Sequence, residues 1–187
     1  MDNFSAANYT DQLGSGGRDA EWDVAGPCDV ALDRRFARAY VTCQTSQLME
    51  LDVNTLDSIN ALDIGARVGL VLTAADGRYA YVGHVSPAGF SVVDLDDFTL
   101  VRTVEVPDES LGTTPFALAV SPDEHYLFLG DAESGYVHVA DISAPERAHF
   151  VDHFRLDGAG IRSIAFAPNG SRAYLSVEPV GIVVLEK

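Results

Sequence analysis

Short apolar runs alternate with polar turns along this chain, and the alternation repeats four times. Near its start, each repeat contains a three-residue apolar run, at 30–32, 70–72, 118–120 and 164–166. A polar turn follows, and then a second run that carries an aromatic residue: AYV, AYV, LFL and AYL. β-branched and aromatic residues favour strands, whereas Asp, Asn, Gly and Pro favour turns. The pattern therefore predicts a β-hairpin at the start of every repeat.

Two further strands complete the first three repeats. The third strand of each ends in an aspartate, at Asp52, Asp94 and Asp141, and a fourth strand follows. The repeats begin at 27, 68, 115 and 161, so their spacings are 41, 47 and 46 residues. A period of about 40–50 residues is typical of four-stranded β-propeller blades. Because no segment has a sustained helical period, we predict an all-β β-propeller with four repeats of four-stranded blades.

The last repeat lacks a fourth strand. Residues 19–26 lie directly before the first repeat, where a fourth strand precedes every other repeat, so we expect this N-terminal strand to close the last blade. Such closure removes exposed sheet edges. The propeller then occupies 19–187, after a polar N-terminal segment at 1–18. The predicted blades are 27–65, 68–106, 115–158, and 161–187 together with 19–26.

Three stretches resemble a known repeat: AADGRYAYVG at 74–83, FSVVDLDDFTLVRTVEV at 90–106 and SPDEHYLFLG at 121–130. They are similar to the YVTN-type β-propeller repeat, in which Ser-Pro-Asp-Gly precedes a Tyr-Val strand and a later strand ends in Asp. The resemblance covers about residues 19–187. It implies a propeller of the kind found in bacterial and archaeal surface-layer and periplasmic proteins. It does not imply one function, because similar blades occur in lactonases, amine dehydrogenase subunits and haem d1 nitrite reductases.

Most propellers of this kind have more blades than this chain supplies. Three arrangements follow: a four-bladed ring, a fragment of a longer propeller, or a homodimer that forms an eight-bladed ring. In the homodimer, the N-terminal strand of one chain completes the last blade of the other. Two-fold symmetry is the simplest route to closure, and the first strands carry no additional glycine for the tight curvature of a small ring. The homodimer is the preferred arrangement, and the other two stay open.

The charge of the chain narrows the choice of partners. There are 28 acidic and 12 basic residues, giving a formal net charge of −16. Such a chain repels nucleic-acid phosphates and anionic membrane surfaces. No apolar run reaches the roughly 20 residues of a membrane span, so no membrane insertion is expected. A protein or a small-molecule ligand is the partner that this composition allows.

The two cysteines, Cys28 and Cys43, flank the first predicted hairpin. If a four-residue loop at 34–37 joins the strands, Cys28 faces Cys43 directly, within reach of a disulfide. Two buried thiols are the alternative. A disulfide indicates an oxidising compartment, so the expected location is extracellular or periplasmic, although the given sequence carries no signal-peptide pattern.

Acidic residues and one histidine fall in loops that a propeller places around one mouth of its channel. His84 lies in the loop GHVSPAG, and three carboxylates lie in corresponding loops, at Asp131, Glu133 and Glu178. Carboxylates and a histidine could hold a divalent metal ion. Solvated loop polarity is the alternative explanation.

No catalytic motif stands out in the sequence. We therefore expect a non-catalytic binding or scaffold propeller that engages a protein or small ligand through one face of the ring, an expectation that rests on the fold. The alternative is an enzyme or electron-transfer subunit with an acidic metal or cofactor site at the channel mouth. The identity of any cofactor beyond that divalent metal ion stays unknown.

Overall fold

The computed structural model describes residues 27–33, 37–43, 46–55, 57–108, 114–156 and 160–187, which form four antiparallel sheets. Sheet 1 contains β1 (Pro27–Asp33), β2 (Arg38–Cys43), β3 (Gln47–Asp52) and β4 (Ser58–Asp63). Sheet 2 contains β5 (Arg67–Thr73), β6 (Tyr79–Ser86), β7 (Ala88–Asp94) and β8 (Thr99–Glu105). Sheet 3 contains β9 (Pro115–Val120), β10 (Tyr126–Asp131), β11 (Tyr136–Asp141) and β12 (His149–Arg155). Sheet 4 contains β13 (Gly160–Phe166), β14 (Arg172–Glu178) and β15 (Gly181–Glu186).

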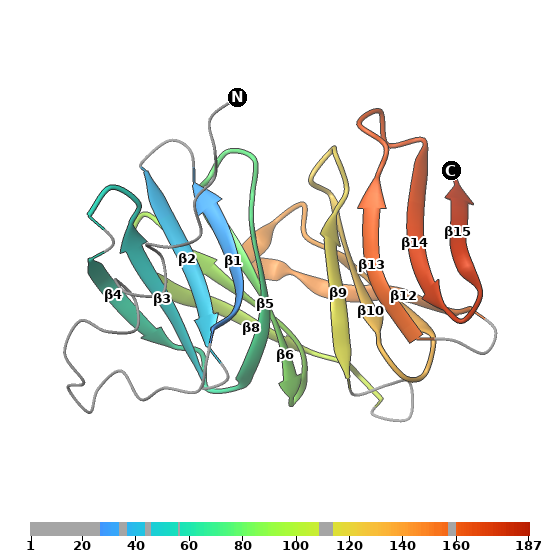
Figure 1. Cartoon of the computed structure of the whole chain (residues 1–187), viewed down its shortest axis with the longest axis horizontal. Coiled ribbons are helices and arrows are strands. Elements are labelled where there is room, and N and C mark those ends of the chain that lie inside the picture. The colour runs from blue at the N-terminus through green and yellow to red at the C-terminus, as the bar shows by residue number, and fades with distance from the viewer. Residues whose placement is uncertain (1–26, 34–36, 44–45, 56, 109–113, 157–159) are drawn as a thin grey trace, which may run out of the picture.

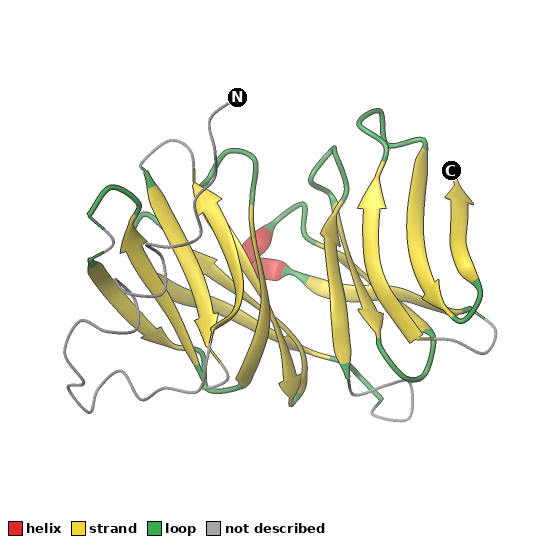
Figure 2. Ribbon diagram, in the orientation of Figure 1, coloured by secondary structure: helices red, strands yellow, loops and turns green. Residues whose placement is uncertain are grey.

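The architecture is all-β and propeller-like, as the sequence predicted. The strands of every sheet follow one another in chain order, and a single short 3-10 helix, η3 (Pro145–Arg147), interrupts the described part of the chain (Figure 2). Among the described residues, none forms a helix with the length and apolar character that a membrane span requires. The segments predicted at 1–18 and 19–26 lie outside the described residues.

The sheets succeed one another as an arc. The first strands of consecutive sheets are neighbours: β1 contacts β5, β5 contacts β9, and β9 contacts β13. Sheet 1 lies at one end of the longest axis of the molecule and sheet 4 at the other (Figure 1). In the described residues, no strand of sheet 1 makes an extended contact with a strand of sheet 4. In the part of the chain that the structure describes, the arc is therefore open between its first and last sheets.

A repeated set of backbone hydrogen bonds relates the four sheets residue by residue. At the end of the third strand, the N–H groups of Val53, Leu95, Ile142 and Lys187 donate to the carbonyls of Ala37, Arg78, His125 and Ser171. These four residues are therefore structurally equivalent. The preceding aspartates cap the turns: Asp52, Asp94 and Asp141 each accept the N–H two residues onward, at 2.8–2.9 Å.

Each junction between consecutive sheets holds one apolar cluster. Tyr40 of β2 belongs to the cluster between sheets 1 and 2, and Tyr81 of β6 and Phe90 of β7 belong to the one between sheets 2 and 3. Phe128 of β10 packs against the third cluster, between sheets 3 and 4. In each of sheets 1, 2 and 3, the aromatic residue of the second strand thus faces the following sheet. Alternate residues of a strand face opposite sides, so each sheet uses its other face toward the preceding sheet.

Sheets 3 and 4 approach most closely near the start of β13. A Cβ atom at Gly160 would lie 1.8 Å from the Ala132 carbonyl oxygen, so the backbone passes there only without a side chain. The Gly130 position is similarly close to the Ile161 side chain, at 2.6 Å. These two glycines fix the distance between the sheets at this end of the junction.

Candidate functional site

The predicted metal ligand His84 lies in a strand and not in a loop, so its placement from the sequence was wrong. The β6–β7 hairpin extends past it, with His84 opposite Gly89 and Val85 opposite Ala88. The side chain is fully buried, and its Nδ1 lies within hydrogen-bonding distance of the Pro87 carbonyl oxygen. Burial lowers the pKa of His84 and outweighs the nearby carbonyls, which favour the protonated ring.

Asp131 ends β10 and caps the loop that follows it. Its carboxylate accepts hydrogen bonds from the Thr114 N–H at 2.6 Å, the Glu133 N–H at 2.9 Å and the Ser134 hydroxyl at 2.7 Å. Burial by itself would raise the pKa of Asp131, but these hydrogen bonds lower it below its usual range. Glu133 itself is exposed to solvent. The carboxylate of Asp131 thus acts as a structural acceptor.

Glu178, at the end of β14, binds an arginine of its own sheet. Its Oε2 lies 2.9 Å from Nε and 2.8 Å from Nη2 of Arg162. The side chains of His84, Asp131 and Glu178 therefore have separate partners. In the described ranges, no three His, Cys, Asp or Glu side chains cluster in a way that could hold a metal ion. The divalent metal site at His84, Asp131, Glu133 and Glu178 stays a prediction from the sequence.

The register around the cysteines agrees with the predicted hairpin except at its last step. Asp33 pairs with Arg38 and Val30 with Val41, but a bulge at Cys28 places Pro27 opposite Cys43. The direct pairing of Cys28 with Cys43 was therefore wrong. Cys28 is exposed, whereas the side chain of Cys43 lies outside the described residues. The disulfide between them remains a prediction.

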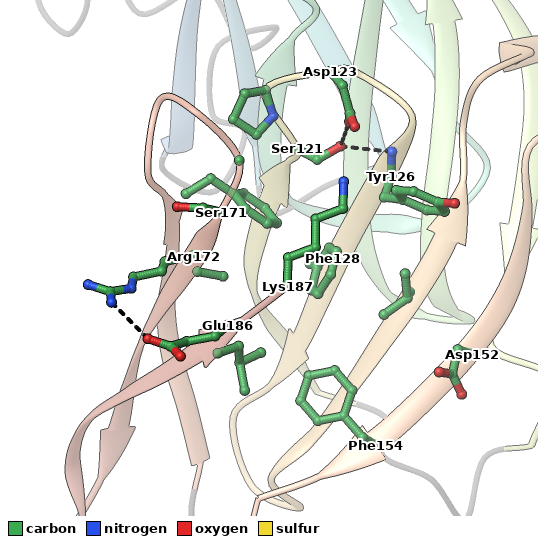
Figure 3. A pocket seen from close by; sticks show the side chains of 16 residues that line it. Ser121, Asp123, Tyr126, Phe128, Asp152, Phe154, Ser171, Arg172, Glu186 and Lys187 are labelled. Carbon is green, nitrogen blue, oxygen red and sulfur yellow. Dashed lines mark hydrogen bonds and ion pairs between the residues drawn. The ribbon is translucent and has the colours of Figure 1, made fainter.

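An apolar groove between sheets 3 and 4 is a concave feature that the sequence did not indicate. It has a volume of about 450 Å³. Aromatic and aliphatic side chains form its apolar lining: Phe128, Val139, Phe154, Phe166, Ala173 and Leu185. Phe128 and Phe154 face it from sheet 3, and Lys187 lies over it from the end of β15 (Figure 3). Apart from Ala173 these residues are only half-buried, so the groove presents apolar surface to solvent.

Charged residues border the groove. Arg172 and Glu186, on neighbouring strands of sheet 4, form an ion pair at 2.8 Å, and Asp152 borders the opposite side (Figure 3). The side chain of Lys187 runs toward the turn that holds Asp123 (Figure 3). The pKa of Asp123 is lowered, mainly because the Ser121 hydroxyl and the His125 N–H donate to it. The positive charge of Lys187 acts in the same direction. An apolar floor with a charged rim suits an amphipathic segment better than a small anion.

Two differences from the earlier junctions accompany the groove: one equivalent position carries a different residue, and the described part of sheet 4 has three strands. Lys187 is equivalent to Leu95 and Ile142, which are buried in the clusters of the two earlier junctions. After Ile142, the chain adds Ala148 and Phe150 to the junction between sheets 2 and 3. Phe150 belongs to β12, the fourth strand of its sheet. Among the described residues of sheet 4, no fourth strand supplies such side chains.

The outer edge of β15 lies beside this groove. In the described residues, β15 pairs with β14 on one side and with no strand on the other. An unpaired edge offers a row of backbone donors and acceptors to another strand. The edge and the groove together form the candidate binding site. The sequence showed that the last repeat lacks a fourth strand of its own, but the apolar groove beside β15 in the described part of the chain depends on side chains of two sheets.

Comparisons with known proteins support the fold alone. No protein-family model matches the chain, and no curated protein matches it. Among solved structures, the chain is similar to Kuenenia stuttgartiensis hydrazine synthase, with a TM-score of 0.76 and 17% sequence identity. The match covers 88% of this chain and 47% of that chain, so this chain spans less than half the length of its structural neighbour. The likeness agrees with a propeller-like arrangement of four antiparallel sheets.

Proposed function

We propose that the protein is a non-catalytic binding module that captures an extended strand of a protein partner along the outer edge of β15. The single observation that carries this proposal is the coincidence of an unpaired edge with an apolar groove in the described part of sheet 4. Strand addition supplies affinity through backbone hydrogen bonds and specificity through alternate side chains. The groove gives those alternate side chains an apolar surface to pack against.

The occupied junctions of the same chain indicate the chemistry of the ligand. Between sheets 2 and 3, Ile142 and Ala148 are buried in the equivalent space, and Phe150 packs against them. A strand that fits β15 should therefore carry apolar residues on the side that faces sheet 3 and polar residues on the other. Fully burying one such side chain contributes about 1.5–3 kcal/mol. A few of them suffice for specific binding.

The chain itself offers a probe for this site. A fluorescent peptide copying residues 142–156, ISAPERAHFVDHFRL, contains the segment that fills the junction between sheets 2 and 3. We expect it to bind the full chain, as measured by fluorescence anisotropy. The same peptide with Ile142→Asp and Phe150→Asp should bind at least about tenfold more weakly.

Two variants of the protein locate the binding. Leu185→Asp places a charge on the floor of the groove and should weaken the peptide at least about tenfold. Leu100→Asp alters an exposed apolar residue on β8, away from the groove, and should leave the affinity unchanged. Equal affinities for the two peptides, or equal effects of the two substitutions, would contradict the proposal.

Two further expectations from the sequence accompany this function as proposals. Membership of the YVTN-type repeat family is supported by the repeated residues at 74–83 and 121–130. An extracellular or periplasmic location is supported by that resemblance and by the predicted disulfide. The enzymatic alternative stays a prediction, because the residues that motivated it have separate partners in the described structure.

A further inference from the structure

The two ends of the arc carry complementary apolar faces. On sheet 4, Tyr174, Ile182 and Val184 are exposed on the face turned away from sheet 3, with Ile182 66% exposed. On sheet 1, Val30 and Leu32 are 57% and 59% exposed, whereas Ala31 between them packs toward sheet 2. Side chains alternate along a strand, so Val30 and Leu32 face away from sheet 2. Each end thus presents the face that an interior sheet buries.

The repeats show what covers such a face. Tyr174 pairs with Val184 as Phe128 pairs with Val139, so Tyr174 holds in sheet 4 the position of Phe128 in sheet 3. Leu32 pairs with Ala39 as Phe166 pairs with Ala173, so Leu32 holds in sheet 1 the position of Phe166 in sheet 4. Phe128 and Phe166 contact each other edge to face, with ring centroids 5.0 Å apart. The surface that fits Tyr174 is therefore one built like the Leu32 face of sheet 1.

Within one chain these two faces lie at opposite ends of the molecule (Figure 1). We propose that a second copy of this chain covers both of them. The Tyr174 face of each copy packs against the Leu32 face of the other, so that two arcs close into one ring of eight sheets. The contact joins different surfaces, and a two-fold axis closes it after two copies. No exposed end face then remains.

Electrostatics gives the dimer a recognisable salt dependence. Each chain carries a formal net charge of −16, so two copies repel each other at long range. Added salt screens this repulsion, while burial of apolar faces persists at high salt. Association should therefore tighten as the salt concentration rises from about 0.05 to about 0.5 M. An assembly held by opposite charges would weaken over the same range.

The mass of the full chain in solution tests the proposal. Light scattering after size-exclusion chromatography, and native mass spectrometry, should give twice the chain mass of 20.0 kDa. Leu32→Glu and Tyr174→Arg should each shift the protein to monomer at the same concentration. Val151→Glu, a charge at an exposed apolar residue of β12, is the matched control and should remain dimeric. A monomeric wild type, or an open series of larger species, overturns the proposal.

Mixing the two monomeric variants separates a lost contact from a lost fold. A pair of Leu32→Glu with Tyr174→Arg retains one unchanged junction and brings the two introduced side chains, which carry opposite charges, together at the other. The mixture should therefore recover the dimer, whereas each variant alone should not. Circular dichroism should report the same strand content for both variants as for the wild type. Failure to recover a dimer from two folded variants contradicts the reciprocal pairing of the faces.

A second readout keeps this inference distinct from the proposed function. The Leu32→Glu variant leaves the groove and the β15 edge unchanged, so it should bind the 142–156 peptide as a monomer. If the wild type is monomeric and the peptide binds, the dimer is wrong and strand capture stands. If the wild type is dimeric and the monomeric variant does not bind the peptide, the strand-capture function is wrong, and the face-to-face dimer stands.

Discussion

The junction between sheets 2 and 3 and the junction between sheets 3 and 4 are built from equivalent residues but differ in burial. Tyr81, Val92 and Val104 of sheet 2 are 3%, 0% and 7% exposed. Their equivalents in sheet 3 are Phe128, Val139 and Phe154, and all three are half-buried and line the groove. The difference does not come from the residues themselves, because the second set is the larger and equally apolar.

What differs is the cover that the following sheet provides. At the junction of sheets 2 and 3, Ile142, Ala148 and Phe150 arrive from the turn and fourth strand of sheet 3. At the next junction, Lys187 holds the position of Ile142, and the described part of sheet 4 has three strands. At the junction of sheets 2 and 3, the outer half is therefore buried by the turn and the last strand of the following sheet. A sheet without that strand exposes the apolar surface of its neighbour.

The largest expected effect tests this difference with two phenylalanines. Phe90 is fully buried between sheets 2 and 3, where Phe150 contacts it edge to face at 5.5 Å. Phe90→Ala should lower the free energy of unfolding by about 4 kcal/mol, because it removes a large side chain and leaves a cavity. Phe154→Ala, on the wall of the open groove, should lower it by about 1–2 kcal/mol, since water already reaches that site.

Urea denaturation followed by circular dichroism measures both values. Equal losses for Phe90→Ala and Phe154→Ala would show that the groove is closed in solution, against the comparison of the two junctions.

The second prediction compares the two ends of one junction, because sheets 3 and 4 pack tightly at Gly160 and leave an open groove at the other end. Gly160→Ala should destabilise the protein by about 3 kcal/mol, because the new methyl group would overlap the Ala132 carbonyl oxygen. Gly69→Ala is the matched control: no atom lies within 4 Å of a Cβ built there. The urea concentration at its denaturation midpoint should differ from the wild-type value by no more than a few tenths of a molar. A tolerated Gly160→Ala would mean that the sheets separate readily at this end too.

The sequence predicted the repeated parts of the fold well and the unique parts poorly. The apolar run, the turn and the aromatic run recur in all four repeats, so each predicted strand is supported by four stretches of the sequence. Placement failed where the chain departs locally from a regular hairpin. The bulge at Cys28 shifts the pairing of Cys43, and the β6–β7 hairpin runs further than its neighbours and takes His84 into a strand.

The candidate site was beyond sequence reasoning for a related reason. The groove is defined by side chains from all strands of sheets 3 and 4 except β9, and its openness depends on how far sheet 4 leaves Phe128 and Phe154 uncovered. One signal was available: the position of Leu95 and Ile142 is a lysine in the fourth repeat. Recognising it required the equivalence of turns that the backbone hydrogen bonds establish.

The smallest expected effect compares two buried ionisable residues near the ends of the second strands, His84 in sheet 2 and Asp131 in sheet 3. The pKa of His84 is lowered because burial disfavours the charged ring. The unfolded chain therefore binds a proton near its ordinary pKa of about 6.5 while the folded protein does not, and stability falls as the pH drops below that value. The pKa of Asp131 is lowered because its hydrogen bonds outweigh burial. Its contribution is complete above the unfolded pKa of about 3.9 and is lost as the pH falls toward the folded pKa.

Acid denaturation should consequently show two separable contributions. His84→Gln keeps a polar side chain without a titration and should remove the decline that begins near about pH 6.5, while leaving the decline below about pH 4. Asp131→Asn should reduce the lower decline, to which other aspartates with a lowered pKa such as Asp52 and Asp141 also contribute, and should leave the upper one. Urea midpoints measured from about pH 8 to about pH 3 provide the test. If His84→Gln leaves the upper decline unchanged, then burial of His84 at the end of the second strand of sheet 2 does not cause that decline.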